Sequence, residues 1–359
     1  MKSTVAVVRT NPDRALEDIH RVMALAGVKH HLRKNVPTIL KVNITWHFYY
    51  PACSTTPWQF DGAVSTLKNL GYGQLIPAQN RTVVINPELG AENNHLTSVL
   101  KKHNLKFVYL YRPDTEWIIY RPKARMMVLD KVYRDGIQIP KMFIGKNAFH
   151  LPTMKTHVFT TITGAMKNAF GGLLNDNRHW THSVIHEALV DLLQIQKEIH
   201  PGIFCLTDGT IAGEGAGPRL MKPHVKNFIL ASGDSVAIDA IAAKMMGFDP
   251  MQLKFLNLAH EKGLGRAKPQ EIRVVGADIR GVNFHFQTKD TIASRGQKAI
   301  YWGKLKPLEH LLLHTPIVPW SFIASRFYHD FYWYTTHGKR IAAAFQQTPW
   351  GKLFQSYAR

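Results

Sequence analysis

Short apolar runs alternate with segments of helical periodicity over residues 1–283 of the chain. The apolar run Val5–Val8 passes into a helix-period segment that ends near Ala26, and residues 38–44 supply a second strand candidate. Residues 60–76 repeat the order as a helix, a glycine turn and a strand. Further strands are expected at Phe107–Tyr111, Lys141–Ile144, Ile203–Leu206, Asn227–Ala231 and Ile272–Val275. This alternation predicts an α/β fold with a mostly parallel central sheet flanked by helices.

The composition changes at residue 284, which divides the predicted chain into two parts. Up to that point the pattern predicts helices such as Ser183–Ile199 and Ser235–Met246, the latter ended by Gly247. Beyond it, segments such as SFIASRFYHDFYWYTTHGKR are dense in aromatic and basic residues and show little strand alternation. We therefore predict an α/β domain over 1–283 and a helical, aromatic-basic C-terminal appendage over 284–359.

The charge balance restricts the partners of the chain more than it restricts the fold. With 45 Lys and Arg against 25 Asp and Glu, the net charge is +20. Such a surplus attracts phosphates, carboxylates, nucleic acid or anionic lipid. The two cysteines, Cys53 and Cys205, stand in unrelated contexts and indicate neither a disulfide framework nor a Cys-rich metal site. Reduced thiols of this kind are typical of a cytoplasmic protein.

No targeting or spanning segment is evident in the sequence. The first residues lack the apolar core of a secretory signal. No apolar run reaches the roughly 18 to 20 residues that cross a bilayer, and the nearest, residues 311–323, is interrupted by His314, Pro316 and Pro319. We therefore expect a cytoplasmic location.

Residues 152–172, PTMKTHVFTTITGAMKNAFGG, contain two lysines, a histidine and five threonines and no acidic residue. Thr163 is expected to cap a short helix that begins at Gly164, and Gly171 or Gly172 is expected to end it with a positive φ. A helix start together with Lys155 and Lys167 would suit a phosphate or carboxylate. The alternative is a solvated basic loop.

Nucleotide binding has no motif support, because neither G-x-x-x-x-G-K-[ST] nor a strand followed by G-x-G-x-x-G occurs. The glycine-rich segment CLTDGTIAGEGAGP places Asp208 just past the predicted strand Ile203–Leu206 and continues through Glu214 and Gly215. An acid at the carboxyl end of a buried strand is a common binding group in open α/β sheets. A plain Asp-Gly turn is the alternative.

Two further acids and a histidine remain ambiguous from the sequence. Asp234 is expected to cap the helix that follows it. Asp239 lies on the apolar first turns of that helix, so it needs a partner if it is buried, and a lysine of the site is one candidate. His182 precedes a helix and could serve as a general base or metal ligand, or it could be a surface histidine. No H-E-x-x-H pattern supports zinc.

Several of these segments, taken in order, resemble the family called domain of unknown function 362. The likeness spans residues 38–266 and rests on KVN, STTPW, PTMKTHVFTTITGAMKNAFGG, the isolated His182, DGTIAGEGAGP, SGDSVAIDAIAAKMMGFDP and GLG. The family usually has Lys-Pro-Asn where this chain has Lys41, Val42 and Asn43, so the resemblance carries over to Lys41 and Asn43. Many relatives contain ferredoxin-like segments. This chain lacks the four cysteines of such a cluster, so no iron-sulfur cluster is expected and the cofactor is unknown.

The leading hypothesis is an enzyme that acts on a small anionic metabolite bearing a carboxylate or phosphate. Three lysines would bind the anion, a histidine would move protons, and Asp208 and Glu214 would complete the acid-base set or hold a divalent cation. The expected catalytic residues are Lys155, His157, Lys167, His182 and Asp208. The expected substrate-binding residues are Lys41, Asn43, Thr55, Thr56, Thr163, Asn168, Glu214 and Gly215.

The alternative hypothesis is a protein that binds an anionic surface through residues 284–359. Aromatic residues beside basic ones can stack on nucleobases or lie at a lipid interface. Nucleic acid is disfavoured because no recognised nucleic-acid module occurs in the sequence. A cytoplasmic protein held at the periphery of the inner membrane would satisfy the same composition. The appendage could also cover the active site as a lid.

Overall fold

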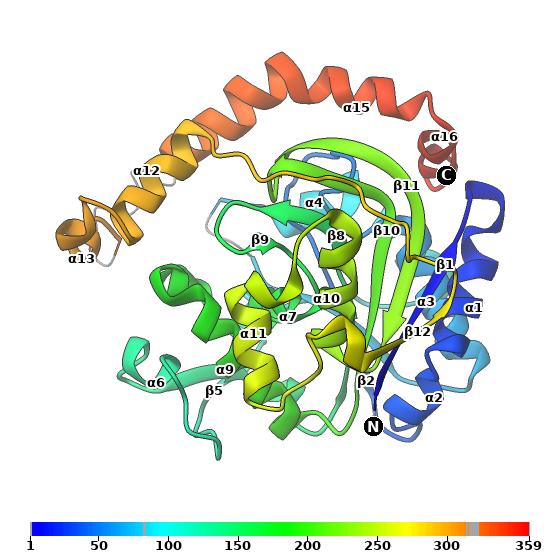
Figure 1. Ribbon diagram of the computed structural model, residues 1–359, viewed down its shortest axis with the longest axis horizontal. Helices are drawn as coiled ribbons and strands as arrows, with labels where there is room; N and C mark the ends of the chain where they lie inside the picture. The colour runs from blue at the N-terminus through cyan, green and yellow to red at the C-terminus, as the bar shows by residue number, and fades with distance from the viewer. Residues whose placement is uncertain (1, 82–83, 314, 316–322, 359) are drawn as a thin grey trace.

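The computed structural model describes residues 2–81, 84–313, 315 and 323–358, and Figure 1 shows their arrangement. A ten-stranded sheet runs through the centre in the order β12-β1-β11-β10-β7-β2-β3-β4, with β8 paired to β10 and β9 paired to β8. Most strand pairs are parallel, and the antiparallel ones are β1-β11, β10-β11 and β8-β9. The predicted α/β class with a mostly parallel central sheet is confirmed.

The strands of the central sheet are β1 Ser3–Arg9, β2 Thr38–Val42, β3 Leu75–Gln79, β4 Val108–Tyr109, β7 Asn147–Leu151, β8 Thr153–His157, β9 Thr161–Ile162, β10 Ile203–Ala216, β11 Leu220–Ser232 and β12 Ile272–Gly276. A separate antiparallel pair consists of β5 Trp117–Tyr120 and β6 Ile137–Pro140. Every residue of β2 is buried, because β2 lies between β3 and β7 in the sheet and helices cover both of its faces.

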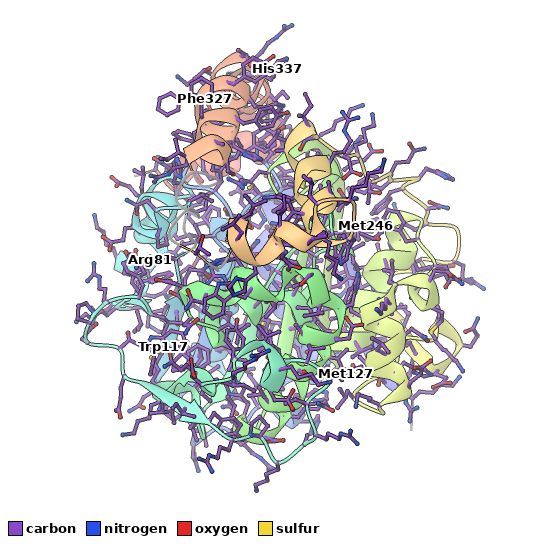
Figure 2. The ribbon with its side chains drawn as sticks, turned by 90° about the vertical axis from the view of Figure 1, so that its left-hand side faces the viewer. Arg81, Trp117, Met127, Met246, Phe327 and His337 are labelled. Carbon is purple, nitrogen blue, oxygen red and sulfur yellow. The ribbon has the colours of Figure 1, made fainter. Side chains whose placement is uncertain are left out.

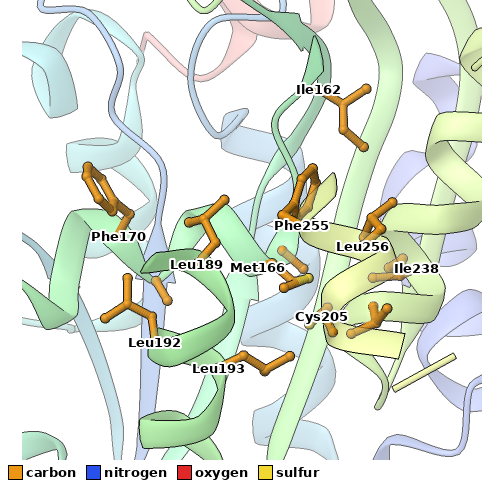
Figure 3. Packing of buried hydrophobic residues seen from close by; sticks show 14 of the residues in the cluster. Ile162, Met166, Phe170, Leu189, Leu192, Leu193, Cys205, Ile238, Phe255 and Leu256 are labelled. Carbon is orange, nitrogen blue, oxygen red and sulfur yellow. The ribbon is translucent and has the colours of Figure 1, made fainter. Parts of the chain in front are cut away.

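Helices cover both faces of the sheet. The helices of the α/β body are α1 Ala15–Leu25, α2 Val28–His31, α3 Pro57–Asn69, α4 Pro87–Asn93, α5 Leu96–His103, α6 Leu129–Val132, α7 Ala165–Asn168, α8 Phe170–Leu173, α9 Ile185–Ile199, α10 Ser235–Met246 and α11 Lys254–Glu261. The helices α1, α3 and α5 share one buried cluster with their face of the sheet, and α7 to α11 share the other. Figure 3 shows part of the second cluster, which includes Leu189 and Leu193 of α9, Ile238 of α10 and Cys205 of β10.

The hairpin of β10 and β11 is much longer than the sequence pattern predicts. The glycine-rich segment after Leu206, which suggests a turn, continues as strand to Ala216. A Cβ at Gly213 would lie 2.5 Å from the Met221 sulfur, so glycine lets the two strands pack closely here. Asp208 consequently lies inside β10 and not past its end, which corrects the predicted boundary.

The predicted strand Lys141–Ile144 is wrong. Residues Lys141–Phe143 form a single 3-10 turn, and the buried strand is β7, Asn147–Leu151. Because β7 contains the polar residues Asn147 and His150, a hydrophobicity pattern does not identify it as a buried strand. Asn147 uses its side-chain amide to donate to the carbonyls of Arg33 and Val36, so it is buried without an unsatisfied amide group.

The described residues of the C-terminal appendage from Ile292 onward are mostly helical, as predicted. The helices are α12 Ile292–Tyr301, α13 Glu309–Leu313, the π-helical segment η7 Phe327–Gly338, α15 Lys339–Gln346 and α16 Pro349–Ser356. Figure 1 shows them running along one edge of the α/β body. The end of this segment is anchored, because Trp350 of α16 is buried against Trp58 at 5.0 Å between ring centroids and donates to Asn227 Oδ1 at 2.7 Å.

No helix within the described ranges is long and apolar enough to cross a membrane. Of the apolar run at 311–323, residue 314 and residues 316–322 lie outside the part that the structure describes.

Candidate functional site

A cavity of about 340 Å³ lies at the carboxyl ends of β2, β3 and β7, where open α/β sheets commonly bind ligands. The lining comes from the ends of these strands, from β8, from the segment that contains α7 and α8, from the 3-10 helix η3 Asp176–Val184, and from the C-terminal appendage. Eight of the predicted site residues line the cavity: Lys41, Asn43, Lys155, His157, Thr163, Lys167, Asn168 and His182.

Lys155 and His157 reach the cavity because they alternate along β8, so both side chains lie on one face of the strand. The Lys155 ammonium donates to the Cys53 carbonyl and to Thr45 Oγ1, the latter at 3.2 Å. Burial lowers the pKa of Lys155 to about 8. No carboxylate pairs with this ammonium within the described residues, so its positive charge is balanced by neutral oxygens alone.

Two of the histidines that line the cavity, His157 and His182, have opposite proton arrangements. Nδ1 of His157 accepts from the Phe159 N–H at 3.1 Å, which places the proton of the neutral ring on Nε2. Nδ1 of His182 donates to the His179 carbonyl at 2.9 Å, which leaves Nε2 as the acceptor. Burial lowers the pKa of His157 well below its usual range and the pKa of His182 to about 3, so both rings are neutral near pH 7. The pair offers one N–H donor and one basic nitrogen.

Lys41 and Asn168 are joined across the floor of the cavity. The Lys41 ammonium donates to Gln79 Oε1 and to the Val42 carbonyl, and Asn168 Nδ2 donates to the Lys41 carbonyl at 2.7 Å. Burial lowers the pKa of Lys41 well below its usual range, and the charge of Arg178 adds to this effect. A Cβ at Gly172 would lie 2.9 Å from Lys41 Cε, so glycine makes room for the lysine.

The predicted helix start at Gly164 exists, but its capping was predicted wrongly. Thr163 does not cap α7; its hydroxyl donates to the Thr153 and Lys155 carbonyls. The Asp239 carboxylate accepts from the Ala165 N–H at 2.7 Å and from the Met166 N–H at 3.0 Å. Burial raises the pKa of Asp239 to about 7. Asp239 therefore occupies the N–H groups that were expected to hold an anion.

The expected end of this helix is also different. Gly171 and Gly172 lie within α8 and have no positive φ, so they do not end a helix through a left-handed conformation. Asp234, in contrast, caps α10 as predicted, accepting from the N–H groups of Val236 and Ala237 at 2.9 and 3.0 Å.

Lys167 projects into the cavity without a hydrogen-bond acceptor in the described part of the chain. Its ammonium lies 5.3 Å from the centroid of the Phe170 ring, over the face of the ring. Burial lowers the pKa of Lys167 to about 7, and repulsion from Lys155 and Arg178 contributes. This amine is therefore available to a bound molecule.

Two arginines in the lining were missed by the sequence interpretation. Arg178 is 5% exposed and donates through Nη2 to the Arg81 carbonyl, while its Nη1 is buried with no hydrogen-bond partner among the described residues. Nη1 of Arg219, which also lines the cavity, is likewise buried with no hydrogen-bond partner among the described residues. Both arginines lie beside motifs that were noticed, Arg178 in RHWTH and Arg219 directly after GEGAGP. A search for basic residues next to those motifs would have found them.

The appendage closes one side of the cavity. Thr291, Ser294 and Tyr301 of the α12 region contribute to the lining, as do Ser325 and His329. The Tyr301 ring stacks on His182 with 5.7 Å between centroids and 13° between planes. The next residue, Trp302, donates to the Ser183 carbonyl at 2.7 Å. The sequence interpretation considered a lid but did not identify these residues.

Five predicted site residues lie outside the lining: Thr55, Thr56, Asp208, Glu214 and Gly215. Asp208 accepts from the Thr56 hydroxyl at 2.5 Å and from both the N–H and the hydroxyl of Thr210. Thr55 donates to the Leu151 carbonyl at 2.7 Å. Glu214 pairs with His224 at 2.8 Å. These polar groups are used in holding β10 and its neighbours together.

The cavity consequently has no acidic wall opposite the lysines. Asp176 is the carboxylate of the described lining, and it already pairs with Arg81 at 2.7 Å. Among the residues that the structure describes, no group of three His, Cys, Asp or Glu side chains is arranged to hold a metal ion.

Comparisons with known proteins place the chain in a family. The family described as "Domain of unknown function (DUF362)" matches residues 38–244, which include β2, β8 and the segment around Lys167. Thylakoid-associated protein sll1697 of Synechocystis sp. is 30% identical over 122 residues, covering 32% of this chain and only 37% of that protein. No solved structure matches the chain. Because the family match covers more than half of its length, the chain belongs to the domain of unknown function 362 family.

Proposed function

We propose that this protein is an enzyme that binds a small metabolite bearing a phosphate or carboxylate in the cavity and moves protons on it. The observation that carries the proposal is that two arginines of the cavity lining, Arg178 and Arg219, each have a buried Nη1 atom with no hydrogen-bond partner among the described residues. A buried N–H donor without an acceptor costs about 1–3 kcal/mol. An anionic ligand would supply the acceptors.

The lysines support the same proposal. Lys41, Lys155 and Lys167 add three amines to the lining, while its Asp176 carboxylate is already paired. Positive groups buried without counter-charges destabilise the free protein, and a bound anion relieves that cost. Each guanidinium group would bind two oxygens of the ligand, because arginine matches phosphate and carboxylate geometry with paired donors.

The histidines supply the chemistry in this proposal. His157 carries its proton on Nε2 and would donate it in a hydrogen bond to charge that develops on the substrate. A bound anion would raise the pKa of His182, so that its free Nε2 could act as the base. Tyr301, stacked on His182, would hold the basic ring in place. The reaction class is thus general base catalysis next to the anionic group of the substrate.

The test combines ligand discovery with matched variants. Native mass spectrometry of the purified protein would identify a bound anion, and calorimetric titration with phosphate, pyrophosphate and di- and tricarboxylates would measure its affinity. We expect Arg178→Gln and Lys167→Gln to weaken binding at least tenfold. The control Arg280→Gln removes an exposed arginine that pairs with Asp278 away from the cavity. If all three variants bind the anion like the unaltered protein, the proposal is wrong.

We also propose a cytoplasmic location at the periphery of the inner membrane. Both cysteines are free and buried, which suits a reducing compartment. The name of the Synechocystis relative describes association with a membrane, the thylakoid. Fractionation of cells into cytosol and washed membranes, with and without high salt, tests this location.

A further inference from the structure

Exposed hydrophobic side chains gather on the C-terminal appendage. Nine of the fifteen large hydrophobic residues that are exposed in the described part of the chain lie within residues 284–359. That segment holds only 76 of the 359 residues. Scattered surface hydrophobics are normal, whereas such a concentration marks a surface that contacts something.

The helix formed by η7 and α15 has two different sides. On its inner side, Asp330 accepts from Trp46 Nε1 at 2.7 Å, and Tyr334 stacks on Phe48 with 4.2 Å between ring centroids. On its outer side, Phe327 and Phe331 are 66% and 68% exposed and stack with 6.2 Å between centroids. Figure 2 shows Phe327 pointing away from the body of the protein. The inner side therefore contacts the rest of the protein, whereas the aromatic rings on the outer side are exposed to solvent.

Basic residues accompany the exposed aromatic rings. Arg326, Lys339 and Arg340 are exposed on the same continuous helix. The appendage as a whole carries ten Lys and Arg against three Asp and Glu, within a chain of net charge +20. An amphipathic helix with aromatic rings and basic side chains on its solvent side is suited to the interface of an anionic bilayer.

We propose that the outer face of α12, η7 and α15 binds the surface of an anionic lipid bilayer. Phe327 and Phe331 insert below the headgroups, and Arg326, Lys339 and Arg340 contact the lipid phosphates. This inference rests on the proposed membrane contact and is independent of the small-anion activity.

Lipid fits this face better than nucleic acid or a second copy of the chain. The most exposed hydrophobic residues include Ile292 and Ile323, at 74% and 61%, and an aliphatic side chain gains little from stacking on a base but much from entering hydrocarbon. The excess of positive charge on the appendage would make two copies repel each other.

The face that we propose to bind lipid belongs to helices that also line the cavity. The helices α12 and η7 that carry Ile292 and Phe327 also carry Tyr301 and His329, which line the cavity. Binding to a bilayer would therefore place the appendage wall of the cavity at the lipid surface.

The experiment is co-sedimentation of the full-length protein with vesicles of phosphatidylcholine alone and of phosphatidylcholine with phosphatidylglycerol. We expect strong binding to the anionic vesicles, weaker binding to the neutral ones, and a decrease as salt rises. The double variant Phe327→Ser/Phe331→Ser and the double variant Lys339→Glu/Arg340→Glu should each weaken binding more than about tenfold. These side chains are exposed, so circular dichroism should show unchanged folding.

Matched controls lie elsewhere on the surface. Ile119→Ser removes an exposed hydrophobic residue of β5, and Arg33→Glu/Lys34→Glu reverses two exposed charges near α2. Both should bind vesicles like the unaltered protein. The proposal is overturned if the unaltered protein stays in the supernatant, if control and test variants bind alike, or if the face binds an oligonucleotide or a second copy and no vesicle. Titration of the cavity with small anions is a separate measurement, so either proposal can fail alone.

Discussion

Replacing Lys167 with methionine should make the free protein more stable while it weakens the proposed ligand site. The ammonium of Lys167 has no acceptor in the described chain, so the substitution breaks no hydrogen bond of that group. Burial holds its pKa at about 7 in the folded protein, compared with 10.5 in the unfolded chain. Between these pH values the unfolded state binds the additional proton, so the stability of the unaltered protein rises with pH through this window. Below pH 7 the full cost of the buried charge applies.

The size of the effect follows from that difference in pKa. The difference in pKa corresponds to a change of at most about 4 kcal/mol in the free energy of unfolding at pH 7. Lys167 is only half-buried, so water in the cavity screens part of the charge. Loss of the contact with the Phe170 ring removes about 0.5–1 kcal/mol of stabilisation. We expect Lys167→Met to raise the free energy of unfolding by about 1–2 kcal/mol at pH 6 to 7, with the gain declining as the pH approaches 10.

The assay is urea unfolding of the ligand-free protein at several pH values between 6 and 10. Lys197→Met serves as the control, because it removes an exposed lysine at the end of α9. The difference in stability between the two variants isolates Lys167 from other titrating groups. Equal stability of the two variants at every pH, or a loss of stability in Lys167→Met at pH 7, would refute the account of Lys167 as an uncompensated buried amine.

Three further predictions concern contacts that only the structure reveals. Asp239→Ala should lower the free energy of unfolding by about 2–3 kcal/mol, since it leaves two buried N–H groups at the start of α7 without an acceptor; urea unfolding measures this, and an unchanged midpoint would contradict it. Trp350→Ala should cost about 3–5 kcal/mol by emptying a buried site, and increased proteolysis of α16 should accompany the loss. Tyr301→Ala removes the ring stacked on His182 and should weaken binding of a cavity anion in titration without changing vesicle binding; equal effects on both would argue against separate sites.

Residues on regular elements were the part of the site that the sequence could predict. Lys155 and His157 alternate on β8, and Lys41 and Asn43 stand at the end of β2, so their common edge follows from strand periodicity and a parallel sheet. The family resemblance carried Lys41 and Asn43 over independently, and membership in that family is confirmed. The same reasoning placed Asp208 wrongly, because glycine content suggested a turn where two strands in fact pack closely.

Contacts between distant segments were not predictable from local patterns. Asp239 lies 74 positions from Ala165, whose N–H it accepts, and nothing near either residue in the sequence indicates the pairing. The sequence motif draws attention to His182 and not to Arg178, although the buried, unpaired Nη1 atom of Arg178 is the stronger indication of an anion-binding site. Tyr301 lies in the appendage, as predicted, and its stacking on His182 in the cavity has no local signal in the sequence.

The sequence alone determined the class of fold, the mostly helical nature of the described part of the C-terminal appendage and the net positive charge of the chain, because periodicity and composition are local or additive properties. Tertiary structure decided which charges are paired and which are not. Asp208, Glu214 and Asp239 each accept hydrogen bonds from neighbouring donors, while the Lys167 ammonium and Nη1 of Arg178 belong to residues that line a cavity and have no acceptor among the described residues. Pairing depends on which side chains the folded chain brings within hydrogen-bond distance, and that is a property of the three-dimensional packing.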